Sequence, residues 1–234
     1  WGSWQNGTYD WNVTAYDNAG NFAVYGAPFK VIIDQTSPNN FAKTAPLPNT
    51  PAALNYYATN IADITFKWAN ASDNDQIRKY ELFIAPEPGS YAASGVDCAL
   101  LTSASRTIAS EGKYKWSVRA YDRALNYRWS KPDFYFVYDV TKPVPGVKEE
   151  PWCTISGGSV TDMFCTKSKN VNFKWTGATD SLAGVKSYEL YIDNNFVNSY
   201  TAAPVTPVLI TNIAEGLHTW NVKVFDYAGN WEWY

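Results

Sequence analysis

One fifteen-residue segment occurs three times in this chain, and it limits the fold more than any other feature. The copies begin at residues 7, 112 and 216, and the fifth residue of each is a tryptophan: Trp11, Trp116 and Trp220. These tryptophans are 105 and 104 residues apart. That spacing is about the length of one small β-sandwich domain and is too long for a solenoid repeat. The chain is therefore predicted to be a tandem array of similar domains.

Each copy has the pattern of a strand followed by a tight turn. In the second copy Tyr114, Trp116 and Val118 fall on one face of an extended strand, and the residues between them are polar or charged. This alternation is typical of a half-buried strand. The strand then runs into a turn rich in Asp, Gly and Asn, which favours a hairpin. The three turns are residues 17–21, 122–126 and 226–230.

Further segments recur in the same order. Residues 64–68 and 171–175 both alternate apolar and polar side chains, and Asp-containing loops connect them to further strands at 80–84 and 188–192. The strands predicted at 29–33 and 134–138 each lead into an Asp-x-Thr-x-Pro linker. Proline has no N–H for strand pairing and stiffens the junction. We expect an elongated array with limited bending.

These motifs resemble fibronectin type III-like and related Ig-like repeats of large bacterial and archaeal surface proteins. The resemblance rests on Trp68 and Trp175, on the three Gly-to-Asn segments and on the linkers, and it covers nearly the whole chain. It implies an all-β fold of tandem Ig/fibronectin type III-like β-sandwich domains in an elongated array. A resemblance of this kind specifies function poorly. The expected division is the last two strands of a first sandwich at 1–34, a complete domain at 35–139, and a third domain lacking its last strand at 140–234.

The resemblance also gives a role to the tyrosine that precedes each tryptophan by two residues. Tyr9 and Tyr114 match the tyrosine corner, in which the phenol hydrogen-bonds to backbone upstream. His218, the single histidine of the chain, occupies this position in the third copy. A metal ligand or general base is the alternative, but no nearby motif supplies a nucleophile and an orienting partner. We interpret His218 as structural.

Both ends of the chain fall inside a predicted sandwich. The last domain stops before the strand equivalent to 134–138, and the chain opens at Trp1 without a signal peptide. We expect the native protein to continue in both directions. The alternative is that another subunit supplies the missing strand, as in donor-strand filaments.

Composition limits the partners and the location. The formal charge of −3 gives no basic surface for nucleic acid, and no apolar stretch approaches the length that spans a bilayer. Aromatic residues make up 17% of the chain, which suits small sandwiches whose cores are filled by large aromatic side chains. We predict an extracellular or cell-surface location.

Cysteines and sequons agree with an oxidising compartment. Cys153 and Cys165 flank a Gly-Gly pair in a polar segment and are predicted to form a local disulfide, with two free thiols as the alternative. Cys98 is left as a buried thiol. Glycans could attach at Asn6, Asn12 and Asn70, each of which begins an Asn-x-Ser/Thr sequon.

Acidic loops raise the question of calcium. Asp73, Asp75 and Asp180 provide oxygen ligands in loops, but no complete ligand set is visible, and the EF-hand pattern is absent. We interpret Asp17, Asp122 and Asp226 as acceptors in turns. The sequence therefore predicts no cofactor, with calcium at the three loop aspartates as the alternative.

No catalytic motif is present. The chain has no Gly-x-Ser-x-Gly elbow, His-Glu-x-x-His motif or phosphate-binding glycine loop. Glu81 and Glu189 could be compared with the carboxylate pair of a glycosidase, but they recur at the same outward strand position of two different domains.

Aromatic residues recur in register around the turns and could stack on sugars, with packing between sheets or domains as the alternative. They are Tyr121, Tyr127, Trp129, Trp231 and Trp233, together with Tyr16, Phe22 and Phe225. We predict a non-catalytic extracellular structural region that acts as a spacer, an adhesin stalk, or a subunit of a surface layer or filament. Its partners would be neighbouring copies or domains, and surface glycans. The alternative function is a carbohydrate-binding accessory region of a secreted enzyme.

Overall fold

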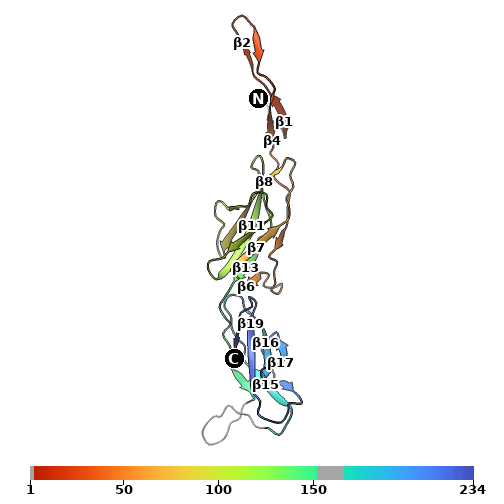
Figure 1. Cartoon of the computed structure of the whole chain (residues 1–234), viewed down its shortest axis with the longest axis vertical. Coiled ribbons are helices and arrows are strands. Elements are labelled where there is room, and N and C mark those ends of the chain that lie inside the picture. The colour runs from red at the N-terminus through yellow and green to blue at the C-terminus, as the bar shows by residue number, and fades with distance from the viewer. Residues whose placement is uncertain (1–2, 152–165) are drawn as a thin grey trace.

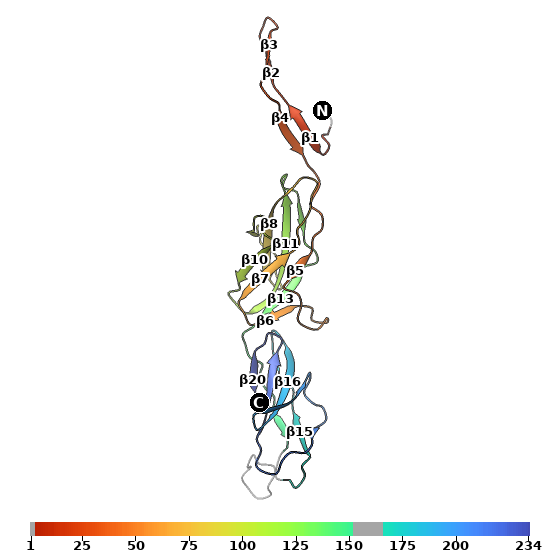
Figure 2. The ribbon, with the colours of Figure 1, turned by 45° about the vertical axis from the view of Figure 1, so that its right-hand side comes forward.

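The computed structural model describes residues 3–151 and 166–234, and these residues form strands and no helix. The strands are grouped in three successive bodies along one long axis (Figures 1 and 2). We call them the leading segment, the middle domain and the last domain. The all-β array expected from the repeats is confirmed.

The leading segment is a long two-stranded ribbon. Its outer strands pair antiparallel, with Trp11 opposite Phe29, and its inner strands form the tip of the hairpin. Trp11 and Phe29 also stack, with ring centroids 5.0 Å apart. No second sheet covers this ribbon among the described residues, and Trp11 is 49% exposed. The strands are β1 (Gly7–Trp11), β2 (Thr14–Tyr16), β3 (Phe22–Val24) and β4 (Phe29–Ile33).

The middle domain is a sandwich of two sheets. The smaller sheet has the order β10-β7-β5, and the larger has the order β6-β13-β11-β8-β9 with β12 also paired to β11. All pairs are antiparallel except β6 with β13. The strands are β5 (Lys43–Ala45), β6 (Tyr57–Thr59), β7 (Asp63–Trp68), β8 (Ile77–Pro86), β9 (Val96–Asp97), β10 (Ser103–Thr107), β11 (Gly112–Asp122), β12 (Tyr127–Trp129) and β13 (Phe134–Tyr138).

The core of the middle domain is built from the alternating residues of both sheets. Phe66 of β7 meets Trp116 of β11 edge-on, with ring centroids 5.0 Å apart, and both side chains are fully buried. Phe136 also contacts Phe66 edge-on, with ring centroids 5.6 Å apart. The opposite face of β11 is more covered than a half-buried strand predicts, because Ser117 is also buried, bonded to the Ser130 carbonyl. The expectation of a polar, open outer face was wrong at this point.

The last domain repeats this plan with fewer strands. Its sheets have the orders β14-β15-β18 and β17-β16-β19-β20, and Trp175, Leu190, Val222 and Val224 fill the space between them. The hairpin predicted after each repeated strand is confirmed as β2–β3, β11–β12 and β19–β20. The strands are β14 (Lys148–Glu150), β15 (Val171–Trp175), β16 (Val185–Ile192), β17 (Asn195–Tyr200), β18 (Val208–Ile210), β19 (Trp220–Asp226) and β20 (Trp231–Trp233).

Candidate functional site at the domain junctions

Three aspartates meet where the chain enters each sandwich. One follows the last strand of the preceding body, one lies in the loop before β8 or β16, and one ends β11 or β19. In each junction these carboxylates offer oxygen atoms that all lie within 4.8 Å of one another. The two sets occupy equivalent repeat positions, and we call them the junction clusters: Asp34, Asp73 and Asp122, and Asp139, Asp180 and Asp226.

In the first junction cluster, hydrogen bonds use only some of the carboxylate oxygens. Asp34 Oδ1 accepts the Thr36 N–H at 3.0 Å and the Asn74 amide at 3.1 Å. Both oxygens of Asp122 accept from Asn126, at 2.9 Å each. The Oδ2 atoms of Asp34 and Asp73 are buried and have no hydrogen-bond partner among the described residues. Two oxygens at this junction therefore lack the partners that buried polar atoms normally have.

In the second junction cluster, backbone amides hold each carboxylate. Asp139 accepts the N–H groups of Ala183 and Thr141, both at 2.9 Å. Asp180 accepts the Gly184 N–H at 2.7 Å, and Asp226 accepts the Gly229 N–H at 2.7 Å. These bonds fix the directions of the side chains, because each is made to a turn of defined shape.

No positive side chain balances these charges. None of the ion pairs among the described residues involves any of the six carboxylates. Burial raises the pKa of Asp73 and Asp226, and it raises the pKa of Asp139 to about 6. The neighbouring carboxylates add to this effect, because like charges disfavour a second ionisation.

An asparagine crosses each junction from the turn that closes the repeated segment. Asn126 Nδ2 donates to the Asp34 carbonyl at 3.0 Å. Asn230 Nδ2 donates to the carbonyls of Asp139 at 2.8 Å and Thr141 at 3.1 Å. Each turn therefore binds the backbone of the linker that enters its domain.

The second junction also has an apolar contact. Ala58 and Val137 of the middle domain pack with Ala183 and Ala228 of the last domain. Polar contacts surround this contact. The Tyr56 hydroxyl donates to the Ala183 carbonyl at 2.7 Å, Asn60 donates to Asn230 at 3.2 Å, and Lys142 pairs with Glu232 at 2.9 Å. The two domains are thus joined by side chains as well as by the linker.

The clusters contain two of the three predicted calcium candidates. Asp73 and Asp180 belong to them, whereas Asp75 faces Arg123 in an ion pair of 3.4 Å. Asp122 and Asp226 accept turn N–H groups as predicted, and they also join the clusters. Sequence reasoning missed the linker residues Asp34 and Asp139. Their recurrence 105 residues apart, directly after a last strand, was the signal that could have found them.

The recurring aromatic residues form a layer on the outer face of β11 and of β19. In the middle domain the Arg119 guanidinium lies over Phe83, Tyr121, Tyr127 and Trp129, with centroid distances of 4.7 to 5.1 Å. The layer therefore packs within its own domain around a cation. The Tyr127 ring at its edge is exposed.

The last domain has the same layer around a lysine. Lys223 Nζ lies 3.8 Å from the Trp231 centroid, 4.8 Å from that of Phe225 and 5.7 Å from that of Trp233. Trp231 is 40% exposed and Trp233 is 37% exposed. Two indoles are therefore exposed on this face, where the middle domain exposes the Tyr127 ring at 49%.

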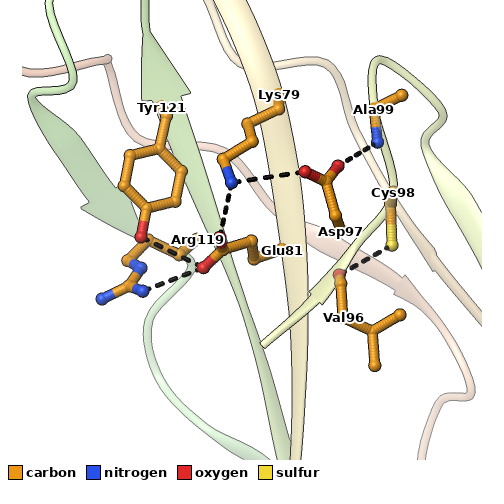
Figure 3. A network of polar contacts seen from close by, with 8 residues as sticks. All are labelled: Lys79, Glu81, Val96, Asp97, Cys98, Ala99, Arg119 and Tyr121. Atoms are coloured by element: carbon orange, nitrogen blue, oxygen red, sulfur yellow. Dashed lines mark hydrogen bonds and ion pairs between the residues drawn. The ribbon is translucent and has the colours of Figure 1, made fainter. Parts of the chain in front are cut away.

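Glu81 neutralises the cation of the middle domain (Figure 3). It receives Lys79 at 2.7 Å, Arg119 at 2.9 Å and the Tyr121 hydroxyl at 3.1 Å. Its equivalent, Glu189, accepts only the Tyr191 hydroxyl among the described residues. The two glutamates therefore lie in different domains and serve local packing, which gives no pair of carboxylates for glycoside hydrolysis.

We expect Glu81→Gln to destabilise the middle domain by about 1.5 kcal/mol at pH 7, since bonds to an ionised buried acceptor are lost. Burial opposes ionisation of Glu81, but the bonds from Lys79, Arg119 and Tyr121 outweigh it and lower its pKa to about 2. The stabilisation is therefore complete above the unfolded pKa of about 4.5 and is lost as the pH falls through about 2. Urea unfolding of the native chain and of Glu81→Gln at several pH values measures this difference in the free energy of unfolding. Glu189→Gln is the matched control and should have little effect.

The predicted tyrosine corners are confirmed. The Tyr9 hydroxyl donates to the Gln5 carbonyl at 2.9 Å, and the Tyr114 hydroxyl donates to the Ser110 carbonyl at 2.7 Å. His218 makes the equivalent bond four residues upstream, from Nε2 to the Ala214 carbonyl at 2.9 Å. Its Nδ1 lies 2.6 Å from Asp193 Oδ2. The histidine thus takes the structural position of the tyrosine.

The single histidine allows a direct titration. The Asp193 carboxylate, with help from the Ala214 carbonyl, raises the pKa of His218 above 6.5, because both ring nitrogens face acceptors. The charged form should therefore stabilise the fold fully below about pH 6.5, and this contribution should be lost as the pH rises through the raised pKa. NMR of the ring proton measures that pKa. Asp193→Asn should lower it, whereas Asp97→Asn in the middle domain should leave it unchanged.

The remaining predicted positions differ in accessibility. Cys98 is buried and free, as expected, and burial raises the pKa of its thiol. Cys153 and Cys165 lie outside the described residues, so their disulfide stays a prediction. Asn6 and Asn12 are exposed but hydrogen-bonded to Thr36 and Gly26, whereas Asn70 is exposed with no side-chain hydrogen bond among the described residues. Of the three sequons, Asn70 is therefore the one whose amide makes no competing hydrogen bond within the described ranges.

Comparisons with known proteins gave matches among solved structures. No family model and no curated protein matches the sequence. Two of the solved structures are similar over most of the chain. One is a segment of two fibronectin type III domains from chicken tenascin, at 14% identity, with a TM-score of 0.33, covering 85% of this chain and 97% of that one. The other is domains A168–A170 of titin, at 10% identity, with a TM-score of 0.41, covering 93% of this chain and 78% of that one.

Both neighbours are tandem arrays. The identities and TM-scores of these matches are too low for an argument about function. The fold assignment rests on the strand pairing described above. The two-sheet sandwich with its tyrosine corner is the fibronectin type III-like or Ig-like architecture. Among the described residues, no helix could cross a membrane.

Proposed function

We propose that this chain is a non-catalytic structural segment of an extracellular or cell-surface protein, in which serial sandwiches act as a stiff spacer or stalk. The observation that supports this most is the repeated junction. The same aspartate and asparagine positions hold the entering linker at both junctions, through Asn126 at the first and Asn230 at the second. A spacer needs this property, because its length is defined only if adjacent domains keep a fixed angle.

The contacts at the second junction favour stiffness over free hinging. Asp139 directly follows the last residue of β13, so little slack exists between the middle domain and the first contact with the last domain. Domains joined by small polar interfaces generally move relative to one another. Here an apolar contact and several hydrogen bonds act together. We further propose that such stalks present an adhesin or assemble into a surface layer or filament with neighbouring copies.

NMR residual dipolar couplings test the stiffness directly. In one aligned sample of residues 1–234, the middle and last domains should share a single alignment tensor, and small-angle scattering should give an elongated particle. Two tensors of clearly different magnitude would contradict the spacer proposal. That result would show domains that reorient independently.

Glycan binding is a second candidate function, favoured by the open aromatic face of the last domain. Lys223 there has only aromatic faces as partners among the described residues, whereas its equivalent Arg119 is neutralised by Glu81. An exposed indole beside a lysine that forms no ion pair among the described residues suits a sugar that carries a carboxylate. Retention on immobilised polygalacturonate, reduced severalfold by Trp231→Ala or Lys223→Gln, would support it. Tyr16→Ala, which removes an exposed ring of the leading segment, is the control.

A further inference from the structure

We propose that each junction cluster binds one calcium ion and that the ion locks the linker onto the domain that it enters. This inference rests on the proposed spacer function and names the ligand that would control its stiffness. The ligands are Asp34, Asp73 and Asp122 at the first junction, and Asp139, Asp180 and Asp226 at the second.

Unpartnered oxygens at the first junction point to a missing ligand. Asp34 is only 8% exposed, and its Oδ2 has no hydrogen-bond partner in the part of the chain that the structure describes. The same holds for the buried Oδ2 of Asp73. A role in turns explains the other oxygens of these residues, which accept backbone N–H groups. It does not explain why two buried acceptors have no hydrogen-bond donor, which costs stability. A cation beside them would remove that cost.

The uncompensated negative charge of the clustered carboxylates is a second reason to propose a bound cation. Three carboxylates within 4.8 Å of one another carry strong mutual repulsion in a water-poor site, and no lysine, arginine or histidine forms an ion pair with them among the described residues. The same arrangement occurs at both junctions, although the loops before β8 and β16 differ in sequence. A bound divalent cation balances most of this charge.

The ligand chemistry selects calcium. The clusters offer carboxylate oxygens and contain no histidine or cysteine, which disfavours zinc. Calcium binds oxygens at about 2.3–2.6 Å, so two of its ligands can be up to about 5 Å apart, and the observed spread of at most 4.8 Å fits one ion. Magnesium usually takes one or two carboxylates and keeps its waters. Calcium would complete its shell with water or nearby carbonyls.

The position of the clusters explains what the ion would do. In each cluster one ligand belongs to the linker and two belong to the following domain. An ion that needs all three binds only when the linker is seated, so it stabilises the seated state by mass action. Calcium would therefore stiffen the array, and its removal would loosen the junctions while leaving the sandwich cores intact.

Calorimetric titration of residues 1–234 with calcium chloride tests the proposal. We expect about two ions per chain, with dissociation constants of about 10⁻⁴–10⁻³ M, the range of extracellular modules. Magnesium chloride at equal ionic strength should bind more weakly. Asp34→Asn and Asp139→Asn should each remove about one ion, since the amide keeps the shape of the side chain but loses its charge. Asp17→Asn is the matched control, because Asp17 has the same turn position in the leading segment outside any cluster.

Dipolar couplings with calcium and with chelator separate this inference from the spacer proposal. A rigid array that neither binds calcium nor responds to chelator would overturn the calcium sites and leave the spacer intact. Bound calcium with independently moving domains would overturn the spacer and the locking role. Circular dichroism and the NMR spectrum of the backbone amides show whether each variant is folded. If a single variant unfolds, terbium titration of the native chain in competition with calcium gives the stoichiometry, and no displaceable binding would contradict the proposal.

Discussion

Trp116→Ala should lower the free energy of unfolding of the middle domain by about 3–5 kcal/mol, the usual cost of truncating a large buried aromatic. The side chain is 0% exposed and lies between Phe66 and Phe134, with ring centroids 5.0 and 5.9 Å away. Alanine would leave a cavity that two packed sheets cannot close. Urea unfolding followed by circular dichroism measures the loss.

The repeat supplies the control for this variant. Trp11 has the same place in the first copy but is 49% exposed, so Trp11→Ala should leave the middle domain unchanged. Trp116→Phe should cost less than Trp116→Ala, because it keeps most of the ring and removes an indole N–H that has no partner among the described residues. Equal effects of Trp116→Ala and Trp11→Ala would refute the assigned core.

Asn230→Ala should destabilise the last domain by about 2–3 kcal/mol and loosen its junction with the middle domain. The side chain is buried, and its amide donates to two linker carbonyls and to Asp226. Alanine leaves those carbonyls without their donor. Urea unfolding gives the stability, and dipolar couplings should resolve into two tensors.

Alanine variants of the equivalent asparagines should lose less stability than Asn230→Ala. Asn126 donates to one linker carbonyl, so Asn126→Ala should cost less. Asn21 is exposed, and within the described ranges its side chain donates only to Asp17 in its own turn, so Asn21→Ala should stay within about 0.5 kcal/mol. If all three variants lost the same stability, the asparagine would act only in its own turn and the junction role would be wrong.

Local patterns predicted most of the fold. The alternation around Trp116 placed the central strand, the turns rich in Asp and Asn placed the hairpins, and the tyrosines two residues before Trp11 and Trp116 placed the corners. These features depend on residues close in sequence, whose periodicity and turn chemistry are visible in one chain.

The junction clusters were only partly predictable. Asp34 and Asp122 are 88 residues apart in sequence and meet only because the sandwich brings a linker, a loop and a strand end to the same edge. The turn interpretation of Asp122 was correct but incomplete, since one side chain can accept turn N–H groups and face a neighbouring carboxylate. Likewise Ser117 lies among the polar residues expected on the outer face of its strand, but it is buried and donates to the Ser130 carbonyl.

The location of the linker aspartate defines the module from which such a chain is built. Every group that seats the entering backbone on the middle domain lies between Asp34 and Tyr138, and the next module starts again at Asp139. Duplication of this interval would copy both the acceptor surface and the linker residue that it receives. Such an array could gain or lose whole modules without redesign of any junction, whereas an insertion that begins at Pro38 would separate each aspartate from the domain that binds it.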